Sequence, residues 1–315
     1  MLSRVAEALF WVGRYVERAE DTARLLDVHF HEVLEDPGVD EAHACAVLLS
    51  VMGVPADTAD KHRDSRAVLE LLGYAEGSSS SIVGALSAAW ENARSAREAL
   101  SADIWECLNS THNSLQTRVA AARDFGPAPF FSYVRERAAN VAGYVEASMS
   151  RDTSYDALVL GRSLERVDMT ARMLAARIGS ARASEGWTST LRACSAHDAY
   201  LRTYQQGVDE PRVVEFLLVD RLFPRSAFYA LRTGERALAR LDPASGRSGL
   251  DEPAHRAIGR ARTDLEFLSA AKLLEGLPDR LLGLQRAVST ISEEVTERLF
   301  AGSPPPQWGL KETQA

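Results

Sequence analysis

The chain has 315 residues, and its 36 lysine and arginine residues against 44 aspartate and glutamate residues give a formal net charge of −8. Hydrophobic residues make up 46% of the chain and charged residues 25%, which is typical of a globular protein and excludes a disordered or fibrous one. The acidic balance argues against nucleic acid as a partner, because phosphate binding needs a cationic surface.

The N-terminus and the cysteines indicate where the protein works. Charged residues such as Arg4 and Glu7 interrupt the first apolar segment, and no uncharged run reaches the ~18 residues of a membrane span. Cys45, Cys107 and Cys194 are widely spaced and form no CxxC pair, so they predict neither a disulfide framework nor a zinc site. We therefore expect a cytoplasmic protein with no membrane partner, no metal and, in the absence of any Gly-rich nucleotide motif, no cofactor.

The chain is dominated by helix formers, and alternating strand patterns are nearly absent. Clusters of Gly, Pro and Asp separate amphipathic segments of helical period. The predicted helices are residues 2–35, 41–52, 65–73, 79–100, 102–123, 129–149, 153–178, 188–205, 211–220, 225–241, 252–274 and 279–300. Three consecutive prolines at 304–306 cannot continue a helix, so residues 302–315 are expected to form a flexible tail. The pattern predicts an all-α bundle of about twelve helices.

An internal repeat is the most informative feature of the sequence. Residues 11–26 read WVGRYVERAEDTARLL and residues 159–174 read VLGRSLERVDMTARML, an offset of 148 residues. Further matches follow in order, with Ser81 and its neighbours matching Ser226 and its neighbours at an offset of 145 residues. We infer two six-helix copies, residues 1–150 and 151–301. We expect them to pack around a pseudo-twofold axis in one compact body, with two domains side by side as the alternative.

Each copy carries a stripe of polar residues along one face of its first helix. At about 100° per residue, the spacing of these residues places them in a narrow sector beside the apolar face. Ion pairs between residues four apart are expected along the stripe. The candidate polar centre consists of Glu17, Glu20, Arg24, Glu165, Asp168 and Arg172. The supporting residues are Gly13, Arg14, Arg18, Gly161, Arg162 and Arg166.

The two stripe glycines need an explanation, because glycine in a helix interior costs about 0.5–1 kcal/mol relative to alanine. They provide either a close approach between helices or room for a ligand beside Glu17 and Glu165. Arg18 and Arg166 lie to one side of the stripe and are expected to bond a different helix. The stripe as a whole is either a structural ion-pair cluster, a site for a polar substrate or a partner's tail, or a solvated surface.

The histidines and serines outside the stripe do not predict a metal or anion site. His29 and His31 in the segment HFHEVLE lie about 200° apart on a helix and cannot share a metal ion, so we interpret the segment as a partly exposed helix end. The loop at residues 77–81 reads GSSSS, which either binds an anion at a helix N-terminus or, as we expect, supplies a serine cap.

The opening sequence LSRVAEALFWVGRYVERAEDTARLLDV resembles the alpha-E domain family, a family of uncharacterised, all-helical bacterial proteins. The signature RYxERAExTARLLDV stands intact at Arg14–Val28, and the similarity extends over nearly the whole chain. Genes of this family commonly lie beside genes for a circularly permuted ATP-grasp protein and a transglutaminase-like protease. The resemblance implies a role in a peptide-forming or peptide-modifying system, alongside an amide-bond-forming ligase, and it supplies no catalytic residues.

Three functional hypotheses follow. The first is an accessory protein that binds the ATP-grasp ligase or a peptide. The second is an enzyme in which Glu17 and Glu165 act as acid and base while Arg24 and Arg172 orient a carboxylate, and it predicts a cavity and a carboxylate with a raised pKa. The third is a structural helical protein with an unidentified partner surface. The sequence leaves homo-oligomerisation open.

Overall fold

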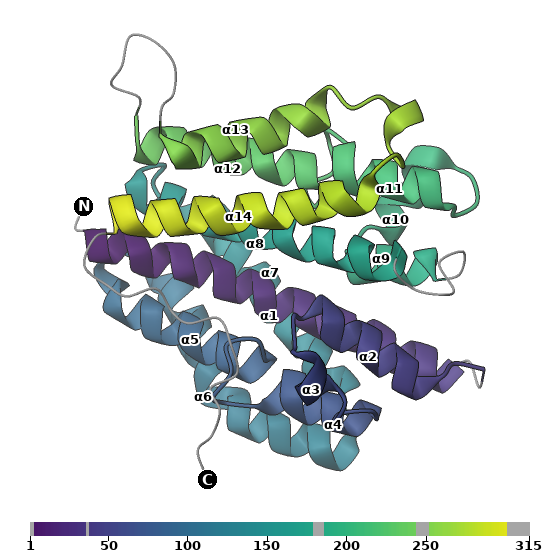
Figure 1. Ribbon diagram of the computed structural model, residues 1–315. Coiled ribbons are helices and arrows are strands. Elements are labelled where there is room, and N and C mark those ends of the chain that lie inside the picture. The colour runs from purple at the N-terminus through teal and green to yellow at the C-terminus, as the bar shows by residue number, and fades with distance from the viewer. Residues whose placement is uncertain (1–2, 36–37, 179–185, 244–251, 301–315) are drawn as a thin grey trace. The chain divides into compact units, whose positions relative to one another are not determined.

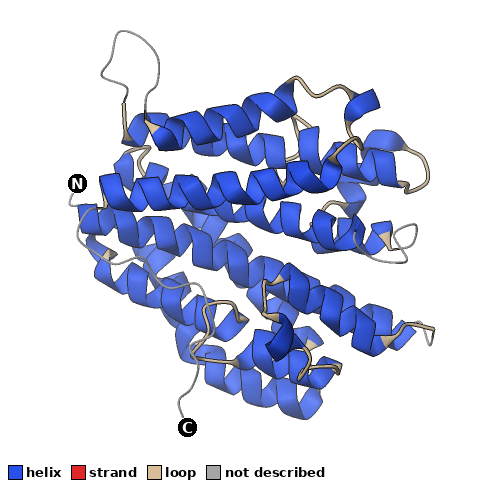
Figure 2. Cartoon of the chain, in the orientation of Figure 1, coloured by secondary structure: helices blue, strands red, loops and turns tan. Residues whose placement is uncertain are grey.

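The computed structural model describes residues 3–35, 38–178, 186–243 and 252–300. Every regular element within these residues is a helix, as Figures 1 and 2 show, so the all-α prediction is confirmed. No helix in this part of the chain has the length and apolarity needed to cross a membrane. The predicted tail, residues 302–315, lies outside the described residues.

The chain divides into two compact units. Unit 1 contains residues 3–14, which are the first turns of helix α1 (Ser3–Glu35), together with the described residues from 151 to 300. Unit 2 contains the rest of α1 and the described residues up to 150. The N-terminal segment of the chain is therefore part of the unit built from the second half of the sequence.

Unit 1 is built around four long helices. Besides the start of α1, its helices are α8 (Thr153–Ile178), α9 (Trp187–Ala193), α10 (His197–Tyr204), α11 (Glu210–Val219), α12 (Ala227–Leu241), α13 (Pro253–Glu266) and α14 (Leu277–Leu299), with a 3-10 turn at Ala270–Lys272. Helix α8 packs against α12 and α14, and α13 packs against the same two helices, so the four form a closed ring. Buried leucine, isoleucine and valine side chains such as Leu160, Leu231, Ile258 and Val288 fill this core.

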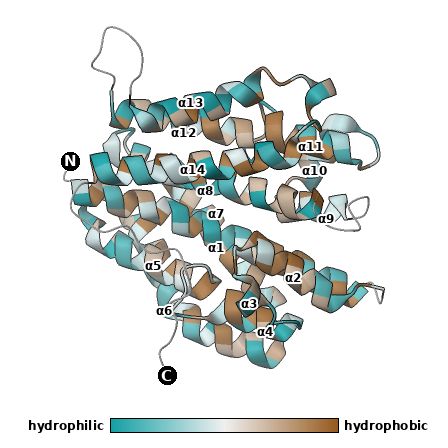
Figure 3. Cartoon of the chain, viewed as in Figure 1, coloured by the Kyte–Doolittle hydropathy of each residue, from teal (hydrophilic) through white to brown (hydrophobic). Residues whose placement is uncertain are grey.

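Unit 2 is also built from helices. After α1 come α2 (Glu41–Val51), α3 (Ala56–Ala59), α4 (Ser65–Leu69), a π-helical turn (Glu70–Tyr74), α5 (Ile82–Ser95), a 3-10 turn (Arg97–Ala99), α6 (Ala102–Phe125) and α7 (Ala128–Ser148). Helix α6 packs against both α5 and α7. Helix α2 is mostly hydrophobic in Figure 3, and its residues Cys45, Leu48, Leu49 and Val51 are buried.

The described residues contain fourteen α-helices rather than about twelve. Helix α3 was not expected, and the predicted helix 188–205 is two helices, α9 and α10. The break falls at Ser195, whose φ of 54° lies in the left-handed region and ends the first of the two. The predicted helix 252–274 stops at Glu266, the end of α13.

Matching serines cap one long helix in each unit. The Ser81 hydroxyl accepts the Gly84 backbone N–H at 2.9 Å and donates to the Ala75 carbonyl. The Ser226 hydroxyl accepts the Tyr229 N–H at 3.1 Å and donates to the Asp220 carbonyl at 2.5 Å. The expected serine cap after the GSSSS loop is therefore confirmed. The same capped turn occurs at positions 145 residues apart, which supports the repeat, while the pseudo-twofold packing of the copies stays a prediction.

Candidate functional site

The stripe glycines of unit 1 lie where α1 crosses α8. A Cβ atom added to Gly13 would overlap the carbonyl oxygen of Leu158, and one added to Gly161 would overlap the carbonyl oxygen of Phe10. The crossing is reciprocal, because Phe10 and Leu158 are themselves separated by the repeat offset. Backbone of the neighbouring helix thus fills the space that each glycine leaves. Of the two explanations for these glycines, close helix approach is the correct one.

One turn further along the same crossing, Arg14 pairs with Glu165. The Arg14 Nε lies 2.7 Å from Glu165 Oε2, and the two side chains are 3% and 1% exposed. Arg14 Nη1 donates to the Ser292 hydroxyl on α14 at 2.6 Å, and that hydroxyl donates to the Val288 carbonyl at 2.7 Å. One guanidinium therefore joins α1, α8 and α14. A buried pair that has lost one partner is strongly destabilising, so these residues fix the helix register.

Asp168 and Arg172 form the outer part of the unit 1 stripe. Arg172 Nε lies 2.8 Å from Asp168 Oδ2, which confirms the expected pairing of residues four apart. Burial raises the pKa of the Asp168 carboxyl above its ordinary value; the Arg172 guanidinium opposes this shift, and the Glu165 charge adds to it. The pKa of Asp168 is thus shifted in the direction that favours its protonated form.

Arg18 and Arg166 make the same contact in their respective units. Arg18 Nη1 donates to the Ser79 carbonyl at 3.4 Å, and Arg166 Nη1 donates to the Pro224 carbonyl at 3.1 Å. Both carbonyls belong to the turn just before the serine-capped helix, α5 or α12. Each of these arginines therefore bonds the turn that precedes a helix of its own unit.

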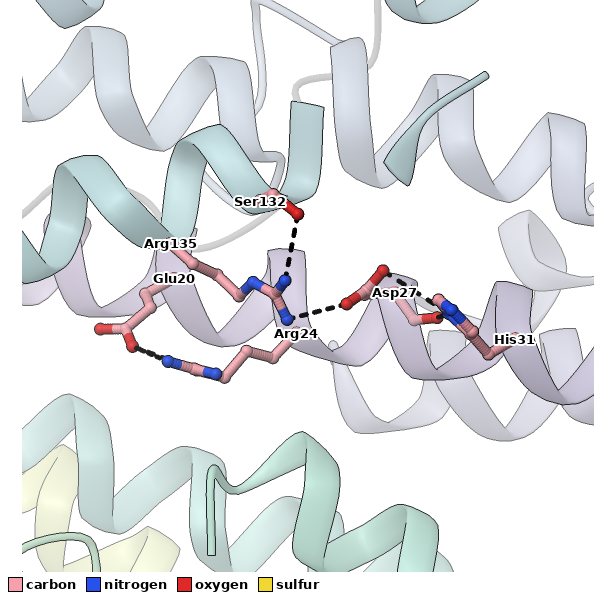
Figure 4. A network of polar contacts seen from close by, with 6 residues as sticks. All are labelled: Glu20, Arg24, Asp27, His31, Ser132 and Arg135. Atoms are coloured by element: carbon pink, nitrogen blue, oxygen red, sulfur yellow. Dashed lines mark hydrogen bonds and ion pairs between the residues drawn. The ribbon is translucent and has the colours of Figure 1, made fainter. Parts of the chain in front are cut away.

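The unit 2 stripe forms two groups of polar contacts along α1, which Figure 4 shows. Arg24 Nη2 lies 2.7 Å from Glu20 Oε1, so the expected pairing of residues four apart is confirmed here too. Arg135 Nη1 on α7 lies 2.8 Å from Asp27 Oδ2, and His31 Nδ1 lies 3.6 Å from Asp27 Oδ1. The Arg135–Asp27 pair joins α7 to α1 within unit 2.

The other residues of the predicted centre lie in both units. Glu17 is buried in unit 2, with 3% of its surface exposed, and Arg162 is half-buried in unit 1. The predicted centre is thus divided between the units: Glu165, Asp168 and Arg172 in unit 1, and Glu17, Glu20 and Arg24 in unit 2.

Several polar residues of these networks were missed from the sequence. Asp27 stands seven residues after Glu20, so extending the stripe by two turns would have found it. Asp156 is buried on α8 and binds Arg240 of α12 through its Oδ1, 2.8 Å from the Arg240 Nε. No local spacing predicts this pair, since the two residues are far apart in sequence. Ser292 gives no sequence signal for the same reason.

The segment HFHEVLE is a partly exposed helix end, as expected: His31, Leu34 and Glu35 are exposed, while His29 is buried. Its Nε2 lies 3.0 Å from the Ser65 Oγ and 3.7 Å from the Cys45 Sγ. Burial lowers the pKa of His29, which favours the neutral ring, and it raises the pKa of the Cys45 thiol to about 11. A thiol with that pKa is a poor nucleophile at neutral pH. In the described part of the chain, no three His, Cys, Asp or Glu side chains are arranged to hold a metal ion.

Comparisons with known proteins agree with a helical protein of this kind. A family model described as a predicted alpha-helical domain with a conserved ER motif matches residues 1–300. Similar curated proteins are an uncharacterized protein of Mycobacterium bovis and an uncharacterized protein of Mycobacterium tuberculosis. Each is 27% identical to this chain over 340 residues, covering 97% of this chain and 38% of the relative, so the chain spans less than half of their length. No solved structure matches the chain.

Proposed function

The chain belongs to the Alpha-E family, and from this premise we propose that it is an accessory or binding protein in a peptide-forming or peptide-modifying system. Its partner in this proposal is a circularly permuted ATP-grasp ligase that forms amide bonds in the cytoplasm. The chain contributes a docking surface, and the ligase carries out the bond formation.

The observation that supports a binding role over a catalytic one is the state of the Arg14–Glu165 pair. Both side chains are almost fully buried and bond each other at 2.7 Å, and backbone carbonyls fill the space beside the two glycines. A carboxylate held in this way stabilises a helix crossing, whereas a general acid or base has to reach a substrate atom. The most distinctive part of the motif therefore serves the fold.

The length of the relatives gives independent support. The mycobacterial proteins contain a region similar to 97% of this chain, and that region makes up 38% of their own length. In those proteins the helical region is joined to a longer stretch of other sequence. Two modules that work together are often brought together by covalent linkage, because linkage raises their effective concentration.

The enzymatic alternative is favoured by one observation, the raised pKa of Asp168. A carboxyl that prefers its protonated form is the kind of group that donates a proton in catalysis. In this alternative Asp168 is the acid and Arg172, which is 30% exposed, orients a carboxylate of the substrate. The Asp168→Asn variant separates the two functions, since it keeps the shape of the side chain and removes the titrating proton.

The experiment combines the full chain with the ATP-grasp protein encoded in the same genome, ATP and amino acids. ADP release and products are read by mass spectrometry, with each protein omitted in turn. We expect no ADP from the helical chain alone, a complex of the two proteins on size-exclusion chromatography, and more product when both are present. The absence of a complex would contradict the proposed function.

Asp168→Asn serves as the control for chemistry in this chain. Because the pKa of Asp168 is raised in the folded state, the native protein binds more protons than the unfolded chain, and ionisation of this carboxyl opposes folding above its ordinary pKa of 3.8. We expect the variant to be at least as stable as the wild type at pH 7, with the difference closing as the pH falls towards 4. Full product formation by the variant with the ligase supports the binding role, and its loss without unfolding supports the enzyme.

A further inference from the structure

The turn between α11 and α12, two helices labelled in Figure 1, presents the large apolar side chain of Leu222 to solvent. Leu222 is 87% exposed, although its neighbour Phe223 is buried and stacks on Phe216 at a centroid distance of 4.7 Å. The turn is held firmly, because Asp220 Oδ1 accepts the backbone N–H groups of Leu222 and Phe223 at 2.8 and 2.7 Å. Leu222 is thus displayed on a fixed turn, which lowers the entropy cost of binding a partner.

The matching turn of unit 2 shows that the fold does not need this leucine. There the serine cap and the arginine bond to the turn carbonyl are the same, yet the residue 145 positions before Leu222 is Gly77. The same comparison replaces Arg221 by Glu76 and Arg232 by Ser87. These three side chains of unit 1 therefore have no role that the capped turn itself requires.

Two arginines flank the exposed leucine. The guanidinium groups of Arg221 and Arg232 lie 5.4 and 5.7 Å from the centroid of the same ring, Phe228, and Arg232 Nη2 donates to the Arg221 carbonyl at 3.2 Å. Among the residues that the structure describes, Arg232 has no carboxylate within ion-pair distance. Two cations that share one ring carry positive charge, in a chain whose net charge is −8.

A second exposed apolar side chain follows a residue that pairs with this turn. Phe267, at the C-terminal end of α13, is 80% exposed. The residue before it, Glu266, pairs with Arg221 across 3.8 Å between its Oε1 and the Arg221 Nη2, which brings the end of α13 beside the α11–α12 turn. Single exposed apolar residues are common, but two of them joined by one ion pair and bordered by arginine are typical of an interaction site.

We propose that Leu222, Phe267, Arg221 and Arg232 form the surface on which an acidic segment of a partner protein docks, with a large apolar side chain of that segment between the leucine and the phenylalanine. The acidic character follows from charge complementarity with the two arginines. The inference rests on the proposed function, since it assigns the face of unit 1 that the ligase occupies.

The test titrates the full chain with the fluorescently labelled ATP-grasp protein from the same genome and measures Kd. Three variants place the unit 2 residue in unit 1: Leu222→Gly, Arg221→Glu and Arg232→Ser. Phe267→Asp is the fourth. Because central apolar anchors carry most of the binding energy of an interface, we expect Leu222→Gly and Phe267→Asp each to weaken binding by about 10- to 30-fold. The arginine variants are expected to weaken binding and to reduce its salt dependence.

Unit 2 supplies matched controls. Phe125, the last residue of α6, is 85% exposed as Phe267 is, so Phe125→Asp tests an exposed phenylalanine outside the surface. Gly77→Leu places a leucine on the matching turn, where an added Cβ meets no other atom. Both controls are expected to leave Kd within about twofold. Thermal melts followed by circular dichroism are expected to be unchanged for the variants at Arg221, Leu222, Phe267, Phe125 and Gly77, because these residues are exposed. Arg232 is half-buried, so the binding of Arg232→Ser is measured below its own melting temperature.

The outcomes separate this inference from the proposed function. If the wild-type chain forms no complex with the ligase, both fail. If the complex forms and the four surface variants bind as tightly as the wild type, only the docking surface is wrong. A parallel titration uses phosphatidylserine–phosphatidylcholine vesicles. Vesicle binding that is lost in the arginine variants, with ligase binding intact, would assign the surface to lipid and overturn the protein partner.

Discussion

The ion pairs of the repeated motif are of two kinds, and the local kind occurs in both units, since Asp168–Arg172 in unit 1 matches Glu20–Arg24 in unit 2. In unit 1, the Arg14–Glu165 pair joins two helices in the core, with exposures of 3% and 1%. In unit 2, the Glu20–Arg24 pair lies along a single helix, with exposures of 10% and 19%. Burial and long sequence separation make the first pair a determinant of the fold, whereas the second is a local pair of small energetic weight. One motif therefore contains residues of different energetic weight.

The largest expected effect comes from breaking the buried pair. Arg14→Met leaves Glu165 as an unpaired buried carboxylate, and we expect the free energy of unfolding of unit 1 to fall by about 3–5 kcal/mol. Urea denaturation followed by circular dichroism measures the loss. The control is Arg94→Met, whose ion pair with Glu91 is more than half exposed and is expected to contribute less than about 1 kcal/mol. Equal losses in the two variants would mean that the buried pair has no special role.

Glycine-to-alanine changes are expected to destabilise the protein at the helix crossing and to stabilise it at open helix positions. Gly13→Ala and Gly161→Ala force a Cβ onto a backbone carbonyl, and each is expected to cost about 1–3 kcal/mol of stability. In Gly143→Ala and Gly283→Ala, the new Cβ meets no other atom, so each change is expected to stabilise its helix by about 0.5–1 kcal/mol. Melting temperatures of the four variants measure the difference. Stabilisation by Gly13→Ala would contradict the close crossing.

The stability of unit 2 is expected to depend on pH through His29, which lies outside the stripe. The pKa of His29 is lowered in the folded state, mainly because the ring is buried, so the native protein binds fewer protons than the unfolded chain. Stability is expected to decrease as the pH falls below the ordinary histidine pKa of 6.5, by at most about 1.4 kcal/mol per pH unit. His29→Gln removes this slope, which denaturation between pH 7 and pH 5 measures. A wild type and variant with parallel slopes would rule out a neutral buried His29.

The smallest effect is expected at the local pair of unit 2. Glu20→Gln removes a partly exposed ion pair between residues four apart, and a loss of about 0.3–0.5 kcal/mol is expected. A double-mutant cycle with Arg24→Gln isolates the pair energy. A coupling above about 2 kcal/mol would place Glu20 in the same class as Glu165. It would remove the difference between the buried pair that joins two helices and the local pair along one helix.

The sequence predicted the features that depend on helical periodicity, and it did not predict contacts between residues far apart in the chain. The helical class, the pairing of residues four apart and the serine caps at Ser81 and Ser226 follow from local spacing. The partners of Arg14 lie 151 and 278 residues away, so no local pattern reveals them. The close contact at Gly13 was one of two explanations until the neighbouring backbone was located. The partly exposed end of the first helix was expected, but the contacts of His29 with Cys45 and Ser65 were not, since they come from other helices and follow no local spacing.

Arg14 is translated long before the groups that it bonds. At about 5–20 residues per second, the 278 residues that separate Arg14 from Ser292 take about 14–56 s to synthesise. Glu165 follows Arg14 after 151 residues, so the carboxylate is synthesised about halfway through this time and the hydroxyl only at its end. The arrangement also makes residue 150 a poor place to divide the gene, because a C-terminal fragment beginning there would bury Glu165 with no cation from the first helix.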